Sequence, residues 1–183
     1  GERGVAVDFF SGWASLGDRG RHAARGGEDQ PIHPSEHCIE RIAERLNLRP
    51  KVAVRINVAV EGLPAWSRFG LNLESGQAKE AIQRLISGGR LQLAGLHCHI
   101  GTFILAPVAY GIAAAKLVEL ANQLKGEYGI KLSFLDLGGG FASKNTLREQ
   151  YLSGDQATPP FDRYADAICE ALAGLDYPPD ELP

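Results

Sequence analysis

The chain has 183 residues, of which 44% are hydrophobic and 22% are charged; these proportions are typical of a globular protein and exclude a disordered or collagen-like chain. Its 19 basic and 22 acidic residues give a formal net charge of −3, which excludes a bulk basic surface for nucleic acid. No apolar run is long enough to span a bilayer and the first residues show no signal-peptide pattern, so we expect neither a membrane nor a nucleic-acid partner.

Two further features of the composition are the spacing of the cysteines and the absence of methionine. The three cysteines are far apart and form no C-x-x-C motif, which indicates reduced thiols in a cytoplasmic protein; they are Cys38, Cys98 and Cys169. The chain contains no methionine, even at position 1, so we expect it to be a processed chain or a piece of a longer one.

Apolar patterns predict strands that alternate with helices. The apolar run 4–10 predicts a short buried strand, and the Gly-rich, charged segment 17–33 predicts an irregular loop. A helix is expected to begin at Pro34 and to end before Pro50. The clearest strand is 52–60, whose β-branched side chains share one face and whose small and polar side chains share the other. The apolar face needs a layer of helices over it, and the opposite face suits the inside of a barrel.

The second half of the chain continues this alternation. A helix capped by Ser75 and ended by Gly88 and Gly89 is expected to precede a strand over 91–100. After it come a helix that begins at Pro107, a strand over 131–137, a polar loop over 142–160 and a last helix over 161–172.

This rhythm predicts βα units and a parallel sheet. Four such units are visible, which is half of an eightfold barrel, and no G-x-G-x-x-G motif follows the first strand to indicate a dinucleotide-binding fold. The predicted fold class is therefore α/β, a partial TIM-like (β/α)8 barrel.

Two histidines lie two residues apart near the carboxyl end of a predicted strand, where barrel enzymes place their sites; they are His97 and His99. One interpretation is a pair of structural histidines with satisfied hydrogen bonds. A second is a metal site, although the other histidines all lie in the N-terminal part of the chain, at His22, His33 and His37. A third is an imidazole stacked on a flat cofactor.

Three glycines, Gly138, Gly139 and Gly140, directly follow a predicted strand. They let the backbone approach a ligand closely and direct N–H groups, unpaired within the sheet, at one anion such as a phosphate; the alternative is a strained turn without a ligand. Thr102 either supplies a hydroxyl to the same anion or caps the next turn. Arg55 projects from the inner face of its strand and needs a carboxylate, a phosphate or a polar cofactor atom.

Four motifs, in this order and at these separations, resemble the barrel domain of the fold-type III pyridoxal-phosphate decarboxylases: VRIN at 54–57, SRFG at 67–70, GLHCHIGT at 95–102 and LDLGGGF at 135–141. Within that family the sequences of these motifs are most similar to those of diaminopimelate decarboxylases, with ornithine and arginine decarboxylases as relatives. The resemblance covers residues 51–172 approximately, and it implies a barrel of the alanine racemase and decarboxylase type.

The resemblance implies roles for individual residues. His99 would stack on the pyridine ring of pyridoxal 5′-phosphate and is the expected catalytic residue. Thr102, where serine is usual in the family, would bond the cofactor phosphate, and Arg55 would line the pocket. The backbone of 138–140 would cradle the phosphate.

The resemblance also implies a function. We expect decarboxylation of an amino acid, diaminopimelate or another basic or diamino acid, in the cytoplasm and, for the complete enzyme, in a homodimer that serves lysine biosynthesis. The family's cofactor-binding lysine, in a Y-x-x-K-A motif, is missing, and its E-P-G-R segment would follow Pro183. We therefore expect residues 1–183 to form an incomplete cofactor-binding barrel domain that is inactive alone. The alternatives are a metal-dependent hydrolase that uses His97 and His99, a racemase of the same fold, and a non-catalytic homologue.

Overall fold

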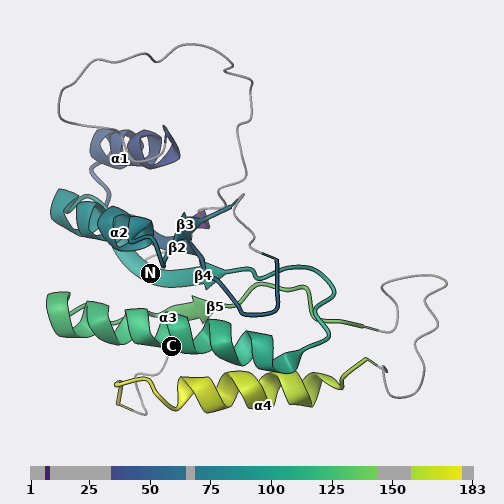
Figure 1. Ribbon diagram of the computed structural model, residues 1–183. Coiled ribbons are helices and arrows are strands. Elements are labelled where there is room, and N and C mark those ends of the chain that lie inside the picture. Colours follow the sequence, from purple (N-terminus) through teal and green to yellow (C-terminus); the bar gives the residue numbers. More distant parts are fainter. Residues whose placement is uncertain (1–6, 9–33, 65–68, 144–157, 179–183) are drawn as a thin grey trace, which may run out of the picture.

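The structure is a computed structural model, and it describes residues 7–8, 34–64, 69–143 and 158–178 of the chain (Figure 1). The predicted loop over 17–33 and most of the predicted loop over 142–160 lie outside the described residues.

Within the described ranges, five strands form one sheet in which every pairing is parallel, as the alternation of strands and helices predicts. The sheet order is β1-β2-β4-β5, and β3 also pairs with β2. The strands are β1 (Val7–Asp8), β2 (Lys51–Asn57), β3 (Leu71–Asn72), β4 (Gln92–Cys98) and β5 (Phe134–Asp136). Apart from the short β3, strands that are neighbours in the sheet also follow one another along the chain, which is the strand order of a βα-barrel.

The described residues form four helices: α1 (Pro34–Leu46), α2 (Gln77–Gly88), α3 (Pro107–Tyr128) and α4 (Phe161–Leu172). Figure 1 shows α2 and α3 flanking the strands and α4 lying along α3. The predicted helix starts at Pro34, Pro107 and Phe161 are confirmed. Proline suits the first turn of a helix, as in α3, because the N–H that it lacks would have no partner within the helix there. None of the described helices is long and apolar enough to cross a membrane.

The core lies between the sheet and the helices. Val52, Val54 and Ile56 of β2 are buried, and they join a cluster with Ile82 of α2 and Leu117 of α3. The predicted helix layer over the β-branched face is therefore confirmed. Polar side chains of β2, β4 and β5 lie on the other side of the sheet, which we refer to as the open face.

Some predicted boundaries are wrong. The helix α2 is capped by Gly76, at φ 84°, with no side-chain cap, because the N–H of Ser75 bonds to the Asn72 side chain at 2.7 Å and Ser75 belongs to the preceding turn. Both long strands are shorter than predicted, and β3 is not among the predicted strands. A two-residue strand is too short to show any alternation.

The contact between α3 and α4 depends on a glycine. A Cβ on Gly111 would lie 3.1 Å from the carbonyl oxygen of Ala167, whereas a Cβ on Gly126, in the same helix, would meet nothing within 4 Å. The absence of a side chain at Gly111 thus lets the two helices approach closely.

This difference gives a matched pair of substitutions. We expect Gly126→Ala to raise the free energy of unfolding by up to about 1 kcal/mol, because alanine is the better helix former. Gly111→Ala brings the same gain in helix propensity, but its methyl group crowds the Ala167 carbonyl. The free energy of unfolding of Gly111→Ala should therefore lie about 1–2 kcal/mol below that of Gly126→Ala. Urea denaturation of both variants measures this difference. Equal gains would contradict the close packing of α3 on α4.

Candidate functional site

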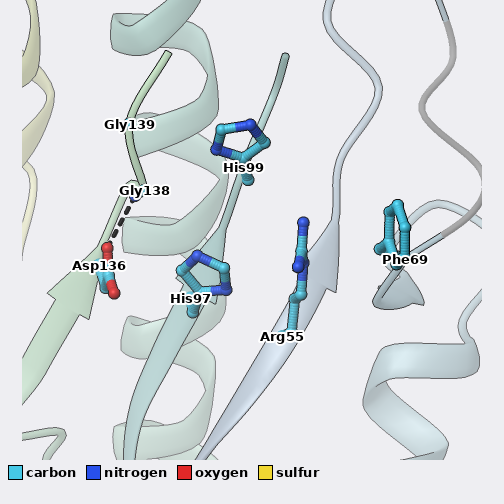
Figure 2. A pocket seen from close by; sticks show the side chains of 7 residues that line it. All are labelled: Arg55, Phe69, His97, His99, Asp136, Gly138 and Gly139. Atoms are coloured by element: carbon cyan, nitrogen blue, oxygen red, sulfur yellow. Dashed lines mark hydrogen bonds between the residues drawn. The ribbon is translucent and has the colours of Figure 1, made fainter. Parts of the chain in front are cut away.

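Three neighbouring strands place three polar side chains in one row on the open face. Arg55 of β2 lies opposite His97 of β4, and His97 lies opposite Asp136 of β5. Because side chains at paired positions of parallel strands point to the same side, the three side chains are neighbours (Figure 2). The row lies near the carboxyl ends of the strands, where the sequence predicts the site.

A pocket of about 520 Å³ opens over this row; its lining residues are Arg55, Phe69, His97, His99, Asp136, Gly138 and Gly139 (Figure 2). Arg55, His99, Gly138 and Gly139 are among the residues predicted from the sequence. Gly140 and Thr102 do not line the pocket but adjoin it. Thr102 is exposed, and its Cα lies 3.3 Å from the position of a Cβ on Gly140.

The Arg55 guanidinium lies over the ring of Phe69, with its central carbon 5.2 Å from the ring centroid. Partial burial lowers the pKa of Arg55 from its usual value, yet a guanidinium stays charged at neutral pH. No carboxylate forms an ion pair with Arg55 in the part of the chain that the structure describes. Of the partners predicted for this arginine, a ligand anion therefore fits better than a structural carboxylate.

Phe69 reaches Arg55 because its neighbour is a glycine. A Cβ on Gly70 would lie 3.0 Å from the Arg55 carbonyl oxygen and 3.1 Å from the Arg55 Cγ, and Gly70 has φ 84°. Phe69 is not among the site residues predicted from the sequence. The signal was present in the SRFG motif, where an aromatic residue precedes a glycine.

His99 lies in the pocket beside Gly138 (Figure 2). Burial and then the positive charge of Arg55 lower the pKa of His99, while the negative charge of Asp136 acts in the opposite direction. The imidazole is therefore neutral at pH 7, and a neutral flat ring suits stacking on an aromatic ligand.

The glycine loop, residues 138–140, fits closely against the segment that carries His99. A Cβ on Gly138 would lie 2.8 Å from Nδ1 of His99, and a Cβ on Gly140 would overlap the carbonyl oxygen of Gly101. Both glycines also have positive φ, 68° and 93°, which other residues rarely adopt. Glycine is therefore required at both positions.

One expectation about this loop is wrong. The Gly138 N–H is not left unpaired, because it donates to Oδ1 of Asp136 at 2.7 Å (Figure 2). An aspartate bonds readily to an N–H two residues further along the chain. Asp136 is a second site residue that the sequence analysis missed, although it stands in the LDLGGGF motif directly before Leu137 and the glycines. The cofactor-binding role of Gly138 stays a prediction.

The metal interpretation finds no support in this arrangement. Among the described residues, no group of three or more His, Cys, Asp or Glu side chains could hold a metal ion. A zinc site needs at least three protein ligands, so His97 and His99 alone do not make one. The side chains of His22, His33 and His37 lie outside the described residues.

The charges around His99 give a prediction that needs no ligand. Arg55→Gln should raise the pKa of His99, since it removes a positive neighbour, and Asp136→Asn should lower it, since it removes a negative one. A pH titration of the His99 Cε1–H signal by NMR measures both shifts. Shifts in the same direction would contradict the arrangement.

The same depressed pKa has a consequence for stability. Below the usual histidine pKa of 6.5 the unfolded chain binds a proton at this position more readily than the folded chain does. The contribution of His99 to the free energy of unfolding is therefore present above pH 6.5 and is lost as the pH falls through the folded-state pKa.

Comparisons with known proteins identify the family of this chain. A family model described as "Pyridoxal-dependent decarboxylase, pyridoxal binding domain" matches residues 22–177. The chain is 32% identical to diaminopimelate decarboxylase from Mycobacterium leprae over 157 residues, which are 78% of this chain and 32% of that protein. It is 37% identical to diaminopimelate decarboxylase from Staphylococcus aureus over 129 residues, which are 66% of this chain and 28% of that protein.

Among solved structures, the chain is similar to diaminopimelate decarboxylase from M. jannaschii, with 28% identity and a TM-score of 0.66. The match covers 81% of this chain and 34% of that one. The chain thus spans about a third of the length of these relatives. The predicted fold, a partial TIM barrel of the alanine racemase type, is confirmed. The chain belongs to the family of fold-type III pyridoxal-dependent decarboxylases, of which it carries the pyridoxal-binding domain region.

Proposed function

We propose that this chain forms the cofactor-binding part of an enzyme that decarboxylates diaminopimelate with pyridoxal 5′-phosphate. The observation that carries the proposal is the pocket at the carboxyl ends of β2, β4 and β5, where Arg55, His99 and the glycine loop meet. The names of the relatives support the choice of diaminopimelate among the basic and diamino acids.

The residues of the pocket fit the two chemical parts of this cofactor. For the phosphate they offer the glycine loop, of which Gly138 and Gly139 line the pocket. For another polar or anionic group of the ligand they offer the Arg55 guanidinium, which has no ion-pair partner among the described residues. For the pyridine ring they offer the neutral imidazole of His99. A pocket with an anion site at one end and a flat ring beside it suits a phosphorylated aromatic cofactor.

Each residue then has a specific task. The glycine loop binds the phosphate group, with Thr102 contributing its hydroxyl. Arg55 lines the polar side of the pocket, and His99 contacts the ring face and keeps its plane fixed. Asp136 keeps the glycine loop in place through its bond to the Gly138 N–H. The cofactor, when bound, accepts the electron pair that remains when a carboxylate leaves as CO₂. The chain's residues hold that ring in register with the substrate bond to be broken.

The wider predictions belong to the same proposal. Homodimer formation, a cytoplasmic location and a place in lysine biosynthesis stay predictions, as do the cofactor-binding roles of the individual residues. The choice of substrate is tested by CO₂ release from the complete enzyme, with diaminopimelate, ornithine, arginine and lysine offered separately. A preference for ornithine or arginine would contradict the choice of diaminopimelate and leave the reaction type unchanged.

The two histidines provide the test of the cofactor site. We expect His99→Ala to weaken the binding of pyridoxal 5′-phosphate at least about tenfold, because truncation removes the ring that stacks on the cofactor. His97→Ala serves as the matched control and should have the smaller effect, since its neighbours in the row are Arg55 and Asp136. Fluorescence titration with the cofactor measures both. Equal and severe losses at the two positions would support a shared metal instead.

A further inference from the structure

Two buried tyrosines bond to the backbone of the loops that border the pocket. The hydroxyl of Tyr110, in α3, donates to the Gly139 carbonyl at 3.0 Å, and the hydroxyl of Tyr164, in α4, donates to the Ile104 carbonyl at 2.6 Å. The two residues are 0% and 2% exposed and neither lines the pocket, so both hydroxyls belong to the core.

The packing around Tyr110 leaves its hydroxyl little freedom. Its ring stacks on Phe141 with centroids 4.4 Å apart, and it meets the edge of Tyr164 at 5.5 Å. The loop that it contacts is also tied to the segment after β4, because the Ile104 N–H donates to the Gly140 carbonyl at 2.9 Å. The Gly139 carbonyl is therefore held from the core side.

The direction of one carbonyl determines the direction of the next amide. The described chain contains no cis peptide bond, so the C=O of Gly139 and the N–H of Gly140, which share a peptide plane, point in opposite directions. Since Tyr110 holds the carbonyl toward the core, the Gly140 N–H points away from Tyr110. The Gly138 N–H, by contrast, is used by Asp136. Of these two donors, the Gly138 N–H is therefore bonded within the protein, and the Gly140 N–H is directed away from the core.

We infer that Tyr110 is a positioning residue for anion binding: by holding the 139–140 peptide, it presents the Gly140 N–H to the phosphate group of the ligand. This inference rests on the proposed function, in which the glycine loop binds the phosphate of pyridoxal 5′-phosphate. Burial raises the pKa of Tyr110 to about 12, so the hydroxyl keeps its proton and remains a donor at any working pH.

The test separates positioning from packing by removing one oxygen atom. Tyr110→Phe keeps the ring and its stacking on Phe141, and we expect it to weaken pyridoxal 5′-phosphate binding about tenfold while it leaves the affinity for pyridoxal, which has no phosphate, unchanged. The control is Tyr177→Phe. The Tyr177 hydroxyl accepts the Leu132 N–H at 2.9 Å, and neither residue lines the pocket. This control should cost stability but leave the ratio of the two affinities unaltered.

The possible results separate the positioning role of Tyr110 from the proposed function. Equal losses for both ligands, or no loss, would overturn the positioning role of Tyr110 while the proposed function stands. Wild-type protein that binds pyridoxal 5′-phosphate no better than pyridoxal would overturn the proposed function, and the inference with it.

A second measurement covers the case in which Tyr110→Phe does not fold. The wild-type protein is titrated with inorganic phosphate and followed by NMR. The Gly140 amide signal should shift strongly and the Gly138 amide signal little, because the Gly138 N–H is already bonded to Asp136. A shift of the Gly138 amide without one at Gly140 would overturn the inference.

Discussion

The site depends on the register between β2 and β4. At the start of the pair Val52 lies opposite Leu93, but the next residue, Ala53, lies opposite Gly95, so β4 contains one extra residue, Ala94. Without this bulge the original spacing would continue and Arg55 would lie opposite Leu96, a core residue that is 0% exposed. With it, Arg55 lies opposite His97 and both face the pocket. Since side chains alternate between faces, a shift of one residue decides whether the site exists.

The charges of the row are then kept apart instead of neutralising one another. The carboxylate of Asp136 accepts the amide of Gly138, and the guanidinium of Arg55 lies over the ring of Phe69, so each has a local partner that is not the other. An aromatic face attracts a cation without cancelling its charge. Arg55 therefore keeps the ability to attract an anion, and its field contributes to the neutral state of His99 between the two charges.

The sequence predicts the parts of this site that are local and misses those that depend on long-range contacts. Proline at helix starts and alternation in 52–60 are visible in the chain itself, and GGG after a strand indicates an anion loop without any structure. The bulge at Ala94 leaves no mark, because GLHCH alternates equally well in either register. Phe69 and Tyr110 look like ordinary core aromatics, since the Tyr110 hydroxyl finds its partner 29 residues away. Ser75 has the residue type of a cap but lies one residue before the actual cap, Gly76.

The two tyrosines also explain why the site and the fold belong together. The helix α3 follows β4, yet its Tyr110 holds the loop after β5; α4 follows β5, yet its Tyr164 holds the segment after β4. Each βα unit thus fixes the loop of its neighbour, and the bond from the Ile104 N–H to the Gly140 carbonyl joins the two loops directly. Neither loop can reach its final shape until both units have packed. Once they have, the N–H groups are set before any ligand arrives, and binding need not order them.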